Sequence, residues 1–196
     1  MRTRLLPLVL TTVFVSACYG ITSPATPATQ FLTAVADVCG QAFAGRVVAN
    51  EPAQPNDPFE GQRLIMHVRT CENNRVLVPF HVGEDRSRTW VLTLEGDRIR
   101  LKHDHRHQDG TEDAVTMYGG DSTTPGTATR QEFPVDAFST EMFTRENRAV
   151  SNTNTWAMEV HPGRMFAYEL TRPGRKFRVE FDLSAPVATP PAPWGY

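Results

Sequence analysis

The sequence predicts one mainly β domain, an antiparallel β-barrel or sandwich-like domain of about eight strands with one or two short helices. Apolar residues recur at every second position along much of the chain after Arg63, which is the spacing of half-buried strands. Pairs of Gly, Asn, Asp and Pro interrupt these runs at the short intervals typical of hairpins. We favour a closed barrel because it leaves no exposed sheet edge.

Residues 1–17 have the form of a secretory signal peptide. Arg2 and Arg4 provide a positively charged start, and the apolar run Leu5–Val15 follows. This run is shorter than the roughly 20 residues that a membrane-spanning helix needs, and no other segment reaches that length. The chain is therefore expected to be exported without spanning a membrane.

The segment Val15-Ser16-Ala17-Cys18 resembles the lipobox of bacterial lipoproteins. The resemblance implies that Cys18 becomes the first mature residue and carries several acyl chains, which would anchor the protein stably. The next residue is Tyr19 and not Asp, and in Gram-negative lipoproteins this implies the periplasmic face of the outer membrane. The alternative is ordinary cleavage after Ala17, which would leave a cysteine without lipid.

The sequence of the first part of the mature chain indicates three segments. Residues 18–30 are rich in Thr, Pro, Ala and Ser and predict a flexible tether. Residues 30–44 carry apolar side chains at helical spacing and predict a short amphipathic helix at the start of a domain spanning 31–185. Residues 51–62 contain several prolines and predict a loop.

The remaining elements follow from the alternating pattern. A second short helix is expected over residues 136–148, with Asp136 as its N-cap and with Phe138 and Met142 facing inward. Residues 119–129 predict a loop, and the Pro-rich tail 186–196 is expected to lie on the surface with Trp194 as an anchor. The predicted strands are 63–69, 76–82, 90–94, 99–107, 114–118, 155–160, 165–171 and 176–183.

Two cysteines remain once Cys18 is assigned to lipid. Cys39 and Cys71 form a pair that an oxidising periplasm would allow to join as a disulfide. A closed loop of about 33 residues would stabilise the fold by roughly 3 to 4 kcal/mol in the chain-entropy model. A structural disulfide is preferred to a redox role because the chain has no Cys-x-x-Cys spacing.

Three histidines alternate along the predicted strand 99–107. His103, His105 and His107 share one face with Ile99 and Leu101, so they are expected to point inward. Neighbouring imidazoles about 7 Å apart could share one zinc or copper ion. We favour the alternative, interior imidazoles hydrogen-bonded to polar neighbours. Candidates for a third metal ligand are His67, His81, Glu112 and Asp113.

The charged hairpin around residues 83–90 is a second candidate site. Arg86 and Arg88 could hold a carboxylate or a phosphate. A solvated hairpin with local ion pairs is the favoured interpretation.

Charge and motif content narrow the function. The chain has 20 Lys and Arg against 22 Asp and Glu, and no basic patch with interleaved aromatic residues, so nucleic acid is not an expected partner. It contains no nucleophile elbow, phosphate-binding glycine loop, dinucleotide fingerprint or His-Glu-x-x-His motif.

Three strings of the mature domain, 81–90, 102–113 and 177–183, resemble a group of uncharacterised secreted or lipoprotein-type bacterial proteins. The resemblance implies an envelope protein but no activity. We expect a non-enzymatic envelope lipoprotein that binds a small ligand or another envelope protein. The alternative is a metal-binding protein or metal-dependent hydrolase that uses His103, His105 and His107.

Overall fold

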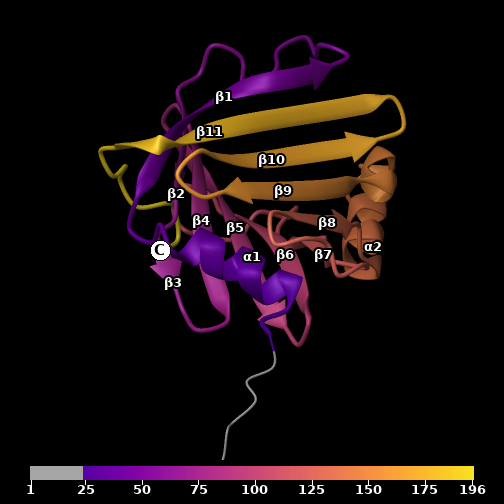
Figure 1. Cartoon of the computed structure of the whole chain (residues 1–196). Coiled ribbons are helices and arrows are strands. Elements are labelled where there is room, and N and C mark those ends of the chain that lie inside the picture. The colour runs from indigo at the N-terminus through magenta and orange to yellow at the C-terminus, as the bar shows by residue number, and fades with distance from the viewer. Residues whose placement is uncertain (1–23) are drawn as a thin grey trace, which may run out of the picture.

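The computed structural model describes residues 24–196, so the predicted signal peptide, lipobox and Cys18 lie outside the described residues. Figure 1 shows an antiparallel sheet that curls into a nearly closed barrel, with α1 across one end and α2 at the side. The predicted fold class is confirmed. The sheet has 11 strands, more than the eight or so expected.

Most strands follow one path around the barrel, in the order β7-β6-β5-β4-β2-β1-β11-β10-β9-β8, while β3 pairs with β4 beside it. Because β1 pairs with both β2 and β11, the first and last strands of the meander meet. The strands are β1 Ala42–Glu51, β2 Leu64–His67, β3 Thr70–Cys71, β4 Arg75–Val82, β5 Asp85–Glu95, β6 Arg98–His105, β7 Tyr118–Asp121, β8 Arg130–Pro134, β9 Thr155–His161, β10 Met165–Arg172 and β11 Arg175–Val187.

The seam of the barrel lies between β7 and β8, the two ends of this path. The backbones approach closely there: the amide of Asp136 donates to the carbonyl oxygen of Gly119 at 2.9 Å. A Cβ atom on Gly120 would lie 1.8 Å from the carbonyl oxygen of Pro134. Glycine at this position therefore allows the seam to close.

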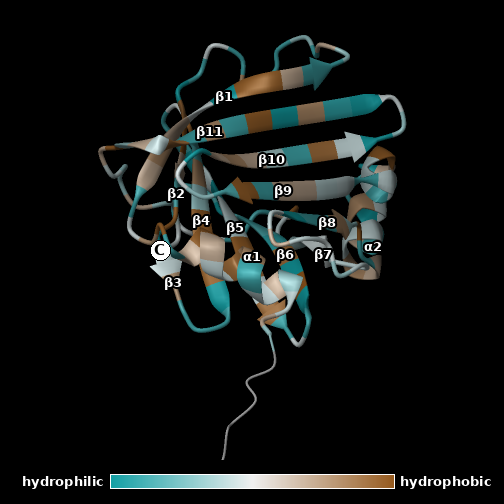
Figure 2. Ribbon diagram, viewed as in Figure 1, coloured by the Kyte–Doolittle hydropathy of each residue, from teal (hydrophilic) through white to brown (hydrophobic). Residues whose placement is uncertain are grey.

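The core fills the barrel with the inward side chains of alternating positions. In β11, the residues Phe177, Val179, Phe181 and Leu183 are buried as predicted, and polar residues stand between them. Figure 2 shows this alternation as brown and teal bands along β11.

Helix α1, Pro27–Ala36, covers one end of the barrel (Figure 1). The hydroxyl of Thr26 caps it by accepting from the amide of Thr29, and Pro27 occupies the first turn. Phe31, Leu32 and Val35 are buried, and the helix contacts β4, β5, β6, β8 and β9. The helix thus begins inside the segment expected to be a flexible tether, because its apolar face is needed to close the core.

Strand β1 corrects the prediction that helix continues to Ala44. The chain leaves the helical conformation after Ala36 and turns at Gly40, which has φ of 81°. Burial alternates from Phe43 to Ala49, although the pairing with β11 has register irregularities between Phe43 and Gly45 and again between Val47 and Ala49. The sequence does not reveal this period of two, because the more buried side includes the small residues Gly45 and Ala49, whereas the exposed side includes the apolar Val48.

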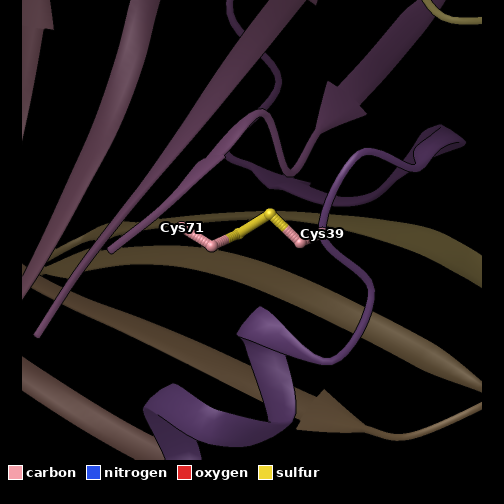
Figure 3. The surroundings of a disulfide bond; sticks show 2 residues. All are labelled: Cys39 and Cys71. Carbon is pink, nitrogen blue, oxygen red and sulfur yellow. A yellow bond between two sulfur atoms is a disulfide. The ribbon is translucent and has the colours of Figure 1, made fainter. Parts of the chain in front are cut away.

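A disulfide joins Cys39, in the turn after α1, to Cys71 in β3 (Figure 3). It ties the end of the helix to the sheet beside β4. The predicted disulfide pair is therefore present in the fold.

The region before and after the seam also differs from the prediction. Strand β7 begins at Tyr118, the last residue of the strand expected at 114–118, and continues into the expected loop 119–129; β8 was not predicted. Helix α2, Ala137–Arg145, is capped by Asp136 as predicted. Its buried residues are Ser139, Met142 and Phe143, whereas Phe138 is 56% exposed, because the helix turns that position away from the sheet. A short 3-10 helix, Ala149–Thr153, follows.

The last residues, 188–196, form what we call the C-terminal strap. The amide of Trp194 donates to the carbonyl of Arg86 at 3.0 Å, and the hydroxyl of Tyr196 donates to the carboxylate of Asp104. Because Asp104 alternates with inward residues, it lies on the outer face of β6, yet it is only 2% exposed. The strap therefore packs over the outside of β5 and β6.

Candidate functional site

A cavity opens at the end of the barrel remote from α1. It has a volume of about 400 Å³, and a smaller cavity of about 60 Å³ lies beside it in the barrel. Helix α1 lies beside Val76 of β4 and Leu94 of β5. Each of these residues is near the end of its strand that is farther from the cavity. The two cavities share Phe59, Arg88, His105, Tyr118 and Tyr168, and the larger one is also lined by Asp113, Val115, Phe143, Arg148, Ser151, Asn154, Trp156, Leu170, Arg172, Arg175 and Phe177.

Strand ends and loops together position these side chains. Arg88 and His105 are paired residues of β5 and β6 near the mouth, and both line the cavity. Phe59 comes from the loop between β1 and β2, and its ring centroid lies 4.7 Å from that of Phe177 and 5.8 Å from that of Phe80. The Pro-rich loop thus contributes one wall of the mouth.

Aromatic rings form much of the remaining wall. The ring of Tyr118 stacks on His103 at 4.5 Å and lies 5.7 Å from Trp156 and 5.3 Å from Phe143. Tyr168 stacks on Trp90 at 4.7 Å. Such surfaces suit the flat or apolar part of a small molecule.

Two histidine–tyrosine pairs provide polar groups inside the barrel. Nδ1 of His103 lies 3.1 Å from the carbonyl oxygen of Tyr118, and Nε2 lies 2.9 Å from the hydroxyl of Tyr168. Since a carbonyl can only accept, Nδ1 donates and Nε2 of the neutral ring accepts from the tyrosine. Nε2 of His105 lies 3.1 Å from the hydroxyl of Tyr118.

Burial keeps these groups uncharged. It lowers the pKa of His103 to about 3, with a smaller contribution from His105. Burial, followed by the charge of Arg88, lowers the pKa of His105 to about 4. Burial also raises the pKa of Tyr118 to about 12. The inner part of the cavity is therefore neutral and polar at physiological pH.

Most of the charged side chains that line the cavity are arginines. Arg88, Arg148, Arg172 and Arg175 line the larger cavity, and Asp113 is its one carboxylate. Arg88 donates to the carboxylate of Asp85, outside the lining. The mouth therefore combines apolar walls with an excess of positive charge.

The structure separates the histidines that the sequence grouped. His103 and His105 point inward from β6, whereas the strand ends at His105 and His107 is exposed in the following turn. His67 and His81 lie on the outer side of β2 and β4, since their sequence neighbours Met66 and Phe80 belong to the core.

Within residues 24–196, no three His, Cys, Asp or Glu side chains are arranged to hold a metal ion. Asp113 does line the cavity, and Glu112 pairs with Arg106 at 3.1 Å. Both ring nitrogens of His103 already have partners, so binding of a metal there would break one of these contacts.

The two arginines of the charged hairpin divide between the two faces of the sheet. Arg86 donates to the carbonyl of Ala192 in the C-terminal strap at 3.1 Å, and Arg88 reaches the cavity. Alternation along the strand could have assigned Arg88 to the interior. Arg172 likewise continues the inward series of Tyr168 and Leu170 on β10. No comparable pattern marks Phe59 or Arg148, which loops bring to the mouth.

Comparisons with protein-family models, with curated proteins and with solved structures gave no match. No described helix is long and apolar enough to span a bilayer. The functional argument therefore depends on the chemistry of the cavity.

Proposed function

We propose that this chain is an envelope lipoprotein, anchored through Cys18, whose barrel binds a small molecule in the cavity at its mouth. The observation that carries the proposal is the cavity of about 400 Å³, which joins aromatic walls to polar groups. Small-molecule sites in proteins have volumes of roughly 300–1,000 Å³ and the same mixture of apolar walls and a few polar groups. The mouth of a β-barrel is a common place for them.

The alternative, zinc or copper bound by His103 and His105, has weaker support. The carbonyl of Tyr118 and the hydroxyl of Tyr168 occupy the two nitrogens of His103, and the hydroxyl of Tyr118 contacts His105. Interior imidazoles with hydrogen-bond partners, the interpretation favoured from the sequence, account for this geometry. We therefore assign the pair to the wall of a ligand cavity.

A neutral fluorescent probe, N-phenylnaphthylamine, tests the proposal. Its fluorescence should rise on mixing with the wild-type protein, because an apolar cavity excludes water from the probe. Ser151→Phe should abolish most of this rise, since Ser151 lines the cavity and the added ring would occupy its volume. Ser184→Phe, on an exposed position of β11, is the matched control and should bind like the wild type. Equal binding by both variants would place the probe elsewhere and contradict the proposal.

A further inference from the structure

Two of the four arginines at the mouth have no carboxylate partner among residues 24–196. Arg172 donates to the amide oxygen of Asn154 at 3.2 Å, a neutral acceptor. Arg148 is exposed at the rim, and its guanidinium has no side-chain acceptor within the described part of the chain. By contrast, Arg88 is paired with Asp85, and Arg175 lies 4.0 Å from Asp57.

Arg130 of β8 and Arg178 of β11, on the outer face of the same barrel, have carboxylate partners. Arg178 donates to both carboxylate oxygens of Glu159 at 3.0 Å, and Arg130 donates to Glu169 at 3.0 Å. Both of these guanidinium groups are therefore matched by carboxylates. Among the arginines of strands β8 to β11, Arg172 is the one without a carboxylate partner in the region that the structure describes.

The position of Arg172 makes its charge costly. The side chain is half-buried, and burial together with the charge of Arg175 lowers its pKa. An anion bound at the mouth would offset the unfavourable effects of burial and of Arg175 on this charge by supplying the missing negative charge. A guanidinium also matches the planar geometry of a carboxylate and the oxygens of a phosphate.

We infer that the ligand of the cavity carries a carboxylate or phosphate group that Arg172 and Arg148 bind at the mouth, while its apolar or aromatic body lies against Trp156 and Tyr118. This inference rests on the proposed function, because it names the chemistry of the molecule in the same cavity. The positive rim also attracts anions before they enter. The neutral histidine–tyrosine pairs deeper inside offer hydrogen bonds to a polar group at the far end of the ligand.

Three probes that share one aromatic body separate the possibilities: naphthoate, its neutral analogue naphthamide, and naphthyl phosphate. Isothermal titration of the wild-type protein should give a Kd for at least one anion about tenfold lower than for naphthamide, the change that one charge-assisted hydrogen bond produces. The ratio of the two anion affinities then tells whether a carboxylate or a phosphate is preferred. Raising the salt concentration should weaken the anions and leave naphthamide unchanged.

Variants at the rim test whether Arg172 and Arg148 bind the anion. Arg172→Gln and Arg148→Gln should each reduce the preference for the anion over naphthamide severalfold. Arg145→Gln removes the same charge from α2, where Arg145 is exposed and paired with Glu146, and should leave the preference unchanged. Because Arg148 is exposed, its substitution leaves the core intact and keeps the test valid even if Arg172→Gln unfolds the protein.

The outcomes distinguish this inference from the proposed function. Equal affinities of the wild-type protein for naphthamide and both anions, with N-phenylnaphthylamine still bound in the cavity, would overturn the inference and leave the proposed function standing. An anion preference that survives in both rim variants would also overturn it. Failure of every aromatic probe to bind would contradict both.

Discussion

Three aromatic rings surround the imidazole of His103, those of Tyr118, Trp156 and Tyr168, with centroids 4.5 to 5.6 Å away. Both ring nitrogens have partners, and one of these is a carbonyl that requires a proton on Nδ1. A second proton would displace the hydrogen bond from Tyr168 and place a charge among rings. The histidine is therefore accommodated as a neutral polar group of the core.

This arrangement predicts loss of stability in mild acid. In the unfolded chain His103 and His105 take up a proton near pH 6.5, whereas in the fold their pKa values are about 3 and about 4. Below pH 6.5 the unfolded state therefore binds more protons. The contribution of these two neutral histidines to the free energy of unfolding is therefore fully present above pH 6.5. It is lost as pH falls from 6.5 toward their pKa values in the fold, by up to about 1.4 kcal/mol per pH unit for each histidine.

Urea denaturation at several pH values between about 5 and about 7.5, a range that includes the ordinary histidine pKa of about 6.5, measures this slope. The free energy of unfolding should fall as pH is lowered, and His103→Gln should make that fall smaller. His107→Gln, at an exposed position, is the control and should keep the wild-type slope. The same slope in His103→Gln as in the wild type would show that His103 titrates normally in the fold.

At the scale of elements, the strands that the sequence predicted are those that bury large apolar residues at every second position. Strand β11 is an example, with four apolar residues inward. Strand β8 escaped prediction because one of its inward residues is Gln131, which is fully buried beside Phe133. A polar residue on the inner face removes the alternation on which the prediction depends.

The candidate site was less accessible from the sequence than the fold. The alternation of side chains along β6 correctly predicted that His103 and His105 lie inside the barrel. His107 does not join them, because the strand ends at His105. The cavity itself depends on Phe59 and Arg148, which come from loops whose paths no local pattern specifies. Its shape is a tertiary property of several strand ends.

The seam between β7 and β8 yields a prediction at this scale. In Gly120→Ala the new methyl group would meet the carbonyl oxygen of Pro134 at 1.8 Å, and backbone on both sides leaves little room to adjust. The substitution should lower the free energy of unfolding by about 3 kcal/mol or more, because the two edges must separate.

Gly163→Ala is the comparison for the seam. Gly163 lies in a hairpin turn with φ of 67°, and an added methyl group would have no heavy atom within 4 Å, so the cost should be only about 1 kcal/mol of backbone strain. Chemical denaturation of the two variants gives the difference directly. Equal losses would mean that β7 and β8 are not in close contact in solution.

The whole molecule has two unlike ends. Helix α1 and the Cys39–Cys71 disulfide close one end, and the arginine-lined cavity opens at the other. Cys18 lies in the sequence just before α1, so an anchor at Cys18 would attach to the closed end. This arrangement would leave the mouth open to the periplasm and away from the membrane surface.

The anchor can be tested separately from the cavity. In a Gram-negative host, the wild-type protein should incorporate labelled fatty acid and fractionate with membranes, because several acyl chains give stable attachment where one gives only marginal binding. Cys18→Ser should lose the label and appear in the soluble periplasmic fraction. Its affinity for N-phenylnaphthylamine should be unchanged, because the cavity lies at the end of the barrel opposite α1. A wild-type protein without label, or a variant that stays with the membrane, would contradict lipidation at Cys18; an altered affinity would instead show that the anchored end influences the mouth.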